Sequence, residues 1–556
     1  MTGTAAPVTE RALGRPVTVL TRGDIERFGG GVLVDVLRLA PGVDVRARGE
    51  RGVQADFVIR GASFGQALVL LDGMRLNDAQ SGHHNADLPI SPASIDRLEV
   101  VAGAASSAHG ADAFGGTINI VTRRGAYREA TAAGGSFESA RGEGAIGWGP
   151  LGLAASAWGS RSGGFMFDRD HAMGGARLAA APSSGSRISA AHLRKAFGAN
   201  GFYGPSPSKE WTDHTLLTAS SGRASDRWSI DARAAYRNHG DRFRWDIARP
   251  GFAENVHRTN AVDANVRVDR TFSRGSRLTL GAAGGGDWIA SSNLGDHTQG
   301  RGSAFAQLHV PAASRFVIQP AVRVDAYSTF GAAVSPSIAL SGWTDRGLRL
   351  RASAGRAFRA PTYTERYYTD PNHRAQATLE PEHGWTLDGG IDWQRASWTA
   401  SATLFRRWDA NVIDWVRASA AERWQTTNVH DVDTHGAELM VGREFGGGFA
   451  RLTYAWTDSS APALTLLSKY VLDYTRHAFG AQIAAELPAR LQLSLRADHR
   501  LRSDRQTYTL VDARLARRLN RVTIFLEGAN LIDETYTEIA GVAMPGQSAM
   551  AGVTIR

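Results

Sequence analysis

The feature that most constrains this chain is a two-residue alternation of apolar and polar side chains from about residue 126 to the end. In residues 227–237, RWSIDARAAYR, Trp228 and Ile230 fall on one face of an extended chain, and Asp231 and Arg233 fall on the other. The segments LRLRASAG, RLQLSLRADHR and RVTIFLEGANL repeat the pattern, with turn sequences such as GWGPLG between them. Soluble sandwiches also alternate, but a run this long, with aromatic residues near segment ends, is typical of a transmembrane β-barrel with a polar interior.

The length of this region fits one barrel size. Residues 126–556 number 431, which leaves about 20 residues for each strand and its connection in a plugged barrel of about 22 strands. A spanning strand takes about 9–11 residues, so the connections average about nine. The sequence therefore predicts an all-β transmembrane barrel of about 22 antiparallel strands.

Residues 1–125 have a different texture and predict a compact α/β unit. Short apolar segments that end in Gly or in basic residues predict strands at 15–21, 55–61, 67–73, 96–103 and 115–124. A helix is expected from residue 23, because Val32, Val36 and Leu39 recur at helical spacing, and Pro41-Gly42 should end it.

Composition excludes several kinds of chemistry. The chain has no cysteine, so it has no disulfide, thiolate metal site or cysteine nucleophile. The net charge is +9, but only three of the 63 basic residues are Lys and the arginines are spread beside acids, which argues against nucleic-acid binding. There is no apolar run of about 18 residues and no secretory signal in MTGTAAPVTERALGRP. The chain is then either not exported, or a mature form with an added Met1, or one whose upstream start is missing.

Several motifs carry a resemblance to a known family. In the first 125 residues they are RPVTVLTRGDIE, VDVLRLAPGVDV, VIRG, VLLDGMRLN, IDRLEVVAG and HGADAFGGTINIVTRR; later come AFRAPTYTERYY with LEPE, FRRWDANVIDWV and ANLIDETYTEIAGVAMPGQ. In this order they resemble TonB-dependent outer-membrane receptors, most closely the cobalamin-transporter subgroup. The resemblance implies an N-terminal segment at 1–15, an α/β plug inside the lumen at 16–125, and an outer-membrane barrel at 126–556.

The resemblance also implies a function in the bacterial outer membrane. The expected activity is TonB-dependent uptake of a scarce metal chelate, with cobalamin first and a ferric siderophore or haem as alternatives. A passive porin or an adhesin is a distant alternative, which the plug disfavours. The expected partners are a TonB-type energy-coupling protein of the inner membrane, the chelate, and outer-membrane lipid and lipopolysaccharide. The protein is expected to be a monomer and not an enzyme, with no intrinsic cofactor; bound calcium is left open.

Two loops hold the candidate ligand-binding residues. The plug sequence SGHHNADLP offers His83, His84 and Asn85; adjacent residues of an extended chain point in opposite directions, so the two histidines should not chelate one ion together. A plain polar loop is the alternative interpretation of this stretch. The barrel sequence TYTERYYTDPNHR predicts an exposed aromatic loop with Tyr363, Tyr367, Tyr368 and His373, or else part of the interfacial aromatic girdle. If haem is the ligand, a plug histidine and His373 could supply axial nitrogens from two sides.

Two further sets of residues have expected mechanical roles. AAPVTE, with Ala6, Pro7, Val8, Thr9 and Glu10, is the candidate TonB-coupling strand, because an extended peptide can add to a partner's sheet edge through main-chain bonds. The alternative is an unstructured terminus. Arg60, Asp72, Arg97 and Glu99 lie at predicted strand ends in the plug, and the resemblance favours ion pairs that lock the plug to the barrel wall over ordinary surface charge.

Some positions depart from the family pattern. Gly103-Ala104, His109-Gly110 and Gln547 stand where the family usually has Gly-Pro, Tyr-Gly and Arg, and the chain ends in Arg556 rather than an aromatic residue, which indicates a clipped or unusual C-terminus. No extra domain precedes the plug, which argues against a signal-transducing receptor. GEGAIG at 142–147 matches a dinucleotide-binding pattern, but a turn rather than a helix follows it, so a barrel strand is expected there.

Overall fold

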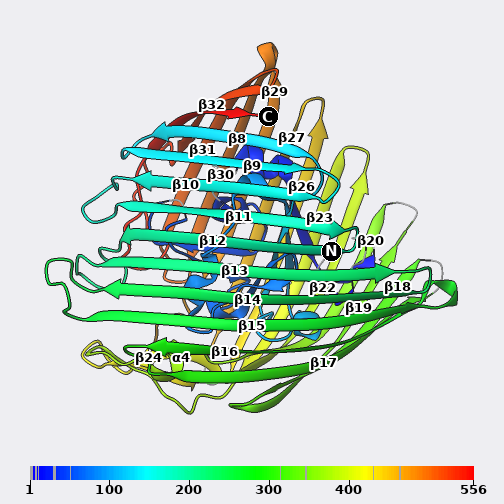
Figure 1. Cartoon of the computed structure of the whole chain (residues 1–556), viewed down its shortest axis with the longest axis horizontal. Coiled ribbons are helices and arrows are strands. Elements are labelled where there is room, and N and C mark those ends of the chain that lie inside the picture. The colour runs from blue at the N-terminus through cyan, green and yellow to red at the C-terminus, as the bar shows by residue number, and fades with distance from the viewer. Residues whose placement is uncertain are drawn as a thin grey trace.

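The structure is a computed structural model, which describes residues 4–6, 9, 12–28, 33–50, 52–312, 315–344, 347–429, 431–461 and 465–556. Its main feature is a closed barrel of 22 antiparallel strands, so the predicted barrel and strand number are confirmed. Figure 1 shows these long strands wrapped around the N-terminal part of the chain, drawn in blue. Among the described residues, none of the helices has the length and hydropathy needed to cross a bilayer.

The barrel strands follow the chain in order, and the circle closes where the last strand pairs with the first, β33 with β8. Their bounds are β8 Tyr127–Gly135, β9 Ser139–Trp148, β10 Leu153–Ser162, β11 His171–Ser183, β12 Ser186–Gly198, β13 Lys209–Ala224, β14 Trp228–Arg244, β15 Glu254–Thr271, β16 Arg277–Ser291, β17 His297–Ala312, β18 Phe316–Tyr327, β19 Gly331–Trp343, β20 Leu348–Arg359, β22 Glu382–Arg395, β23 Trp398–Ala410, β26 Val432–Phe445, β27 Gly448–Ser460, β29 Thr475–Leu487, β30 Leu491–Arg502, β31 Thr507–Leu519, β32 Val522–Ala529 and β33 Ser548–Ile555. GEGAIG lies within β9, as expected for a barrel strand.

The barrel wall is apolar outside and polar inside, the reverse of a soluble protein. In β14, Trp228 and Ile230 are exposed on the outer surface, whereas Arg237, His239 and Asp241 are buried against the contents of the lumen. Since side chains alternate between the two faces of a strand, the two-residue period sets both the lipid-facing band and the charged lining.

The N-terminal unit fills the lumen, and residues 12–122 are called the plug below. Its five-stranded sheet has the order β1-β6-β7-β4-β5, beside the hairpin β2-β3. The strands are β1 Val17–Thr21, β2 Val43–Ala47, β3 Ala55–Ile59, β4 Ala67–Leu71, β5 Met74–Arg75, β6 Ile95–Ala102 and β7 Gly116–Thr122. Leu20, Val45, Ile59, Leu98 and Ile118 belong to one apolar core. The plug therefore has a core of its own, and it faces the barrel mainly with polar groups.

The described helical residues near the start of the plug fall within the helix that the sequence predicts, apart from Arg22. One helix was expected from residue 23, but the structure has α1 Arg22–Phe28 and α2 Leu33–Leu37, and residues 29–32 lie outside the described part. The chain has turned by Gly42, whose φ of 70° favours glycine, and β2 follows. The third helix, α3 Ser106–His109, packs against β18, β19 and β20.

The two ends of the barrel differ in their connections. One end has tight turns such as 149–152 and 184–185, and the other has long connections at 360–381, 411–431, 461–474 and 530–547; they are called the turn end and the loop end. At the loop end lie α4 Tyr363–Tyr367 and a separate sheet of β21 His373–Arg374, β25 Trp424–Val429, β24 Val412–Arg417 and β28 Leu467–Ser468. Figure 1 shows α4 and β24 together beyond the barrel strands.

Candidate ligand-binding and plug-anchoring sites

The two adjacent histidines lie on a short 3-10 helix, Gly82–Ala86, at the loop end of the plug. Ser81 caps this helix by accepting a hydrogen bond from the His83 amide. The backbone is therefore helical rather than extended, which corrects the expected conformation. His83 and His84 still point to different places, because successive residues of a 3-10 helix are about 120° apart.

His83 belongs to an aromatic group at the top of the plug, called the apical patch: Phe64, His83, Tyr203 and Tyr470. The His83 ring stacks on Phe64 with centroids 4.2 Å apart and meets the edges or tilted faces of Tyr470 at 6.1 Å and Tyr203 at 6.5 Å. Tyr203 is 40% exposed. Since the loop 199–208 supplies Tyr203 and the loop 461–474 supplies Tyr470, plug and wall build this surface together.

A charged pair supports the apical patch from below. His83 Nδ1 lies 2.7 Å from Asp56 Oδ1, and Arg48 is 3.0 Å from the other Asp56 oxygen. Burial lowers the pKa of the His83 imidazole, and the nearby Asp56 carboxylate only partly offsets this. Burial raises the pKa of Asp56, but the charge of Arg48 and the hydrogen bond from His83 outweigh it and hold the pKa of that carboxyl well below its usual range. The patch therefore presents a neutral imidazole above a fixed ion pair.

The tyrosines of the barrel loop are less exposed than expected. Tyr363 is buried, and its hydroxyl donates a 2.7 Å hydrogen bond to Asp287 of β16. Tyr367 stacks on His297 with centroids 3.6 Å apart, and the Tyr368 hydroxyl donates to Asp370 at 3.0 Å. The expectation of an exposed aromatic loop is therefore wrong for Tyr363, which Asp287 draws inward, whereas Tyr367 and Tyr368 remain partly exposed.

His373 lies beside the apical patch without joining it. Its Nδ1 is 3.0 Å from Asp370 Oδ1, and its Nε2 is 3.0 Å from the Lys469 ammonium. Because Tyr470, the neighbour of Lys469, contacts His83, the two histidines flank one segment of chain. Both ring nitrogens of His373 are in contact with other groups, so axial ligation of haem would require the Lys469 contact to break.

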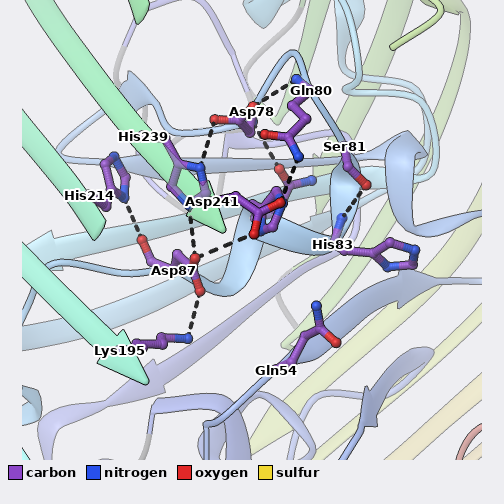
Figure 2. Close-up of polar contacts among 12 residues, drawn as sticks. Gln54, Asp78, Gln80, Ser81, His83, Asp87, Lys195, His214, His239 and Asp241 are labelled. Carbon is purple, nitrogen blue, oxygen red and sulfur yellow. Dashed lines mark hydrogen bonds and ion pairs between the residues drawn. The ribbon is translucent and has the colours of Figure 1, made fainter. Parts of the chain in front are cut away.

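Asn85 and His84 face the interior of the molecule. Asn85 is buried, and its side-chain oxygen accepts a hydrogen bond from the Asp78 amide at 3.1 Å, which closes the base of the loop. His84 meets the barrel wall in a group called the interface cluster: His84 and Asp87 of the plug with Lys195, Glu210, His239 and Asp241 of β12, β13 and β14. All six side chains are buried. Figure 2 shows Asp87 among Lys195, His214 and His239, while the His83 ring points away from them.

Distances within the interface cluster show which contacts are made. Asp87 Oδ1 is 2.6 Å from the Lys195 ammonium, and Asp87 Oδ2 is 2.9 Å from His239 Nε2. His84 Nε2 is 3.5 Å from Asp241 Oδ2, and His84 Nδ1 is 3.9 Å from Asp87 Oδ2. Burial lowers the pKa of His84, but the hydrogen bond to Asp241 and the nearby carboxylates outweigh it and raise the pKa to about 10.

The expected plug-lock residues have different partners. Arg60 reaches the wall: Nε and Nη2 donate to Glu438 at 2.8 and 2.6 Å, and Nη1 donates to Asp388. Asp72 accepts from the amide and the hydroxyl of Thr122 within the plug and lies 3.8 Å from Arg177 of β11.

Arg97 instead pairs with Asp96 and Glu99 of its own strand, β6. These two ion pairs are internal to the plug. The charge of Arg97 is therefore paired with carboxylates of its own strand.

The candidate coupling segment is only partly described. Pro7, Val8 and Glu10 lie outside the described residues, whereas Ala6 is buried and Thr9 is exposed. Next to Ala6, the Ala5 amide donates to Gln307 and the Ala5 carbonyl accepts from Arg267, both at 2.9 Å. These contacts hold residues 4–6 against the inner wall.

Sequence reasoning missed the wall residues that complete both anchoring groups. They are Lys195, Glu210, His239, Asp241, Asp388 and Glu438. The two-residue period could have marked Arg237, His239 and Asp241 as one inward face of β14. Nothing in the sequence indicates which strands lie beside His84, because that depends on how the plug is seated in the barrel.

Comparisons with known proteins agree with this architecture. The family described as "TonB dependent receptor-like, beta-barrel" matches residues 148–531, and "TonB-dependent Receptor Plug Domain" matches residues 9–117. A relative named vitamin B12 transporter BtuB, from Photobacterium profundum, is 25% identical over 479 residues, which cover 81% of this chain and 76% of the relative.

Solved structures of similar fold include two receptors. The siderophore receptor PirA from Acinetobacter baumannii has a TM-score of 0.79 at 15% identity, over 99% of this chain and 100% of that one. The pyoverdine outer membrane receptor FpvA from Pseudomonas aeruginosa PAO1, bound to pyoverdine, has a TM-score of 0.81 at 14% identity, over 100% and 98%. At these identities the likeness concerns the fold alone.

Proposed function

This chain belongs to the TonB-dependent receptor family of outer-membrane transporters, and we propose that its cargo is cobalamin. The loop end then faces the outside of the cell and the turn end faces the periplasm. A TonB-type protein of the inner membrane supplies the energy by pulling on the N-terminal segment. The apical patch is the surface that first receives the ligand.

The observation that carries the cargo proposal is the aromatic surface of the apical patch. The rings of Phe64, His83 and Tyr470 contact one another with centroids 4.2 to 6.1 Å apart, and Tyr203 joins them through His83 at 6.5 Å. Flat amphipathic rings suit a large planar macrocycle such as a corrin, whose cobalt is already coordinated and needs contacts rather than protein ligands. The similarity to a vitamin B12 transporter over 81% of the chain supports the same choice.

The lumen supports active transport rather than diffusion. A cavity of about 240 Å³ lies between the plug and β9–β12 on one side and β30–β33 on the other. Binding sites for drug-sized ligands measure about 300–1,000 Å³. The cavity is smaller than such a site, and in the proposed mechanism part of the plug moves to let a chelate pass, whereas a diffusion pore needs no plug.

Titration of the detergent-purified protein with cyanocobalamin, ferric siderophores and haemin tests the cargo. Cyanocobalamin should bind, and Tyr470→Ala should weaken it by roughly 2–10-fold, the worth of one aromatic contact of about 0.5–1.5 kcal/mol. Trp228→Ala, at the turn end, is the matched control and should leave the affinity unchanged. Binding of a ferric siderophore alone would contradict the proposal. So would haemin binding with a Soret shift that His83→Ala or His373→Ala abolishes.

A further inference from the structure

The interface cluster contains buried polar atoms that no protein group satisfies. Glu210 Oε2 and Asp241 Oδ1 have no hydrogen-bond partner among the described residues, and neither does His239 Nδ1. Burying a carboxylate oxygen without a partner costs on the order of 1–3 kcal/mol, and more for a charged group. Two such oxygens on neighbouring strands of one wall require an explanation.

The charges of the cluster are also unbalanced. Three carboxylates, from Asp87, Glu210 and Asp241, face one permanent cation, Lys195. Lys195 leaves two of these negative charges uncompensated; a protonated His84 offsets one of them, and a neutral His84 bound to a metal offsets neither. The neighbouring Asp78 does not change this balance, because Arg237 pairs with it at 3.0 Å.

We propose that the interface cluster binds a divalent transition-metal ion through His84 Nε2 and one carboxylate oxygen each of Glu210 and Asp241. The three donor atoms lie within 4.8 Å of one another. Bonds of about 2.1 Å in a tetrahedral site place donors roughly 3.4 Å apart, so side-chain rotations of about 1 Å bring them to an ion. The ion compensates both negative charges.

A second donor set, His84 with Asp87 and His239, also meets the distance condition. Its oxygens are already engaged, since Asp87 Oδ1 contacts Lys195 and Asp87 Oδ2 contacts His239. Asp87 better fits the role of orienting His84: with Nε2 on the metal, the Nδ1–H points toward Asp87 Oδ2, 3.9 Å away. Such carboxylate–histidine–metal arrangements fix the ring and its tautomer.

The donor set selects the class of ion. An imidazole with two carboxylates suits Zn²⁺ and its first-row neighbours, whereas Ca²⁺ and Mg²⁺ prefer oxygen donors alone. The absence of cysteine from the whole chain excludes thiolate sites. Because His84 comes from the plug and the two carboxylates come from β13 and β14, the ion ties the plug to the wall. Displacing this part of the plug must break that tie.

Metal binding by the full chain in detergent tests the proposal. After removal of metals with a chelator, Zn²⁺ titration followed by calorimetry and elemental analysis should give one tight site per chain. Co²⁺ should bind in its place and develop a visible absorption band that Zn²⁺ abolishes. His84→Gln, Glu210→Gln and Asp241→Asn should each abolish the tight site. His171→Ala, which removes a buried wall histidine outside the cluster, is the control and should keep it.

One further variant separates the two donor sets. Asp87→Asn removes an orienting partner, so the affinity should fall by only about 10–100-fold. Loss of the site in Asp87→Asn with retention in Glu210→Gln would overturn the assignment. So would a wild-type chain that binds no Zn²⁺; His84 would then be a protonated bridge between carboxylates. Heat-modifiable migration on gels verifies that each variant is folded, and cobalamin binding does not enter the result.

Discussion

The plug meets the wall in two buried polar regions that are built on different principles. At Arg60, one guanidinium is shared by the carboxylates of Glu438 and Asp388 and lies 4.3 Å from the Phe405 ring centroid. At the interface cluster, carboxylate oxygens and an imidazole nitrogen have no hydrogen-bond partner in the described part of the chain. Both regions hold the same two bodies together, so the difference is whether the buried polar atoms have hydrogen-bond partners.

The two regions can therefore play different roles in holding the plug. Charges that are fully hydrogen-bonded to each other in a buried site fix one arrangement, and breaking that arrangement leaves the partners unpaired. Buried carboxylate oxygens that lack a donor, as at Glu210 and Asp241, are completed when a cation joins them. The first region positions the plug by itself, whereas the second makes the hold on the plug depend on a bound ion.

Breaking the matched region should have the largest effect. Arg60→Leu leaves Asp388 and Glu438 buried without their cation, which should lower the free energy of plug unfolding by about 3–5 kcal/mol. Because the chain has no cysteine, a dye on Arg27→Cys in the exposed part of α1 can report urea unfolding of the plug. Arg60→Leu combined with Asp388→Asn and Glu438→Gln should recover most of the loss; no recovery would show that the pairing itself contributes little.

Completing the unmatched region should have a smaller effect of opposite sign. Zn²⁺ at 100 times its dissociation constant should raise the free energy of plug unfolding by about 2.7 kcal/mol, since it binds only the folded cluster. The same urea assay measures it. Asp241→Asn should show no increase. An equal increase in that variant would place the ion elsewhere.

A third site with a buried carboxylate, at Asp414, lies in the loops. Asp414 of β24 is held by neutral donors: it accepts from the Ser468 hydroxyl and from the amides of Trp415, Tyr470 and Val471. Burial raises the pKa of Asp414 to about 6, and these hydrogen bonds only partly oppose it. Hydrogen bonds from neutral donors thus reduce the free-energy cost of burying the ionised carboxylate but do not remove it.

This raised pKa makes the loop sensitive to pH. Protonated Asp414 stabilises the folded conformation of the loop. This stabilisation is complete below about pH 3.8 and is lost as the pH rises through about 6. After correction for intrinsic rates, amide exchange in residues 467–472 should be roughly 50-fold faster at pH 7 than at pH 4, or about 2.4 kcal/mol. Asp414→Asn should abolish the difference; a variant that keeps it would exclude Asp414 as the cause.

The barrel could be predicted from the sequence because its cause is local. Alternation decides which side chain of β14 faces lipid, and the chain length is compatible with about 22 strands. Five of the plug strands could be predicted from short apolar segments. The hairpin strand β2 Val43–Ala47 and the two-residue β5 Met74–Arg75 were not predicted.

The sites depend on contacts that the sequence does not encode locally. His83 and His84 were singled out, but their partners come from residues 48–64, from strands β12–β14 and from the 461–474 loop. Tyr363 looked exposed because its acceptor, Asp287, lies 76 residues away in the chain. Such pairs depend on how distant segments of the chain pack together, in the barrel loops and between the plug and the barrel wall.

Uptake by cells tests the central claim, energy-dependent import of cobalamin past a displaceable plug, most directly. Cells that lack their own cobalamin receptor and express this chain should accumulate radiolabelled cyanocobalamin well beyond the amount bound. Without the TonB-type protein, binding should stay the same and accumulation should fall to the level of cells without the chain. Equal accumulation with and without that protein, or the absence of cobalamin binding, would contradict the account.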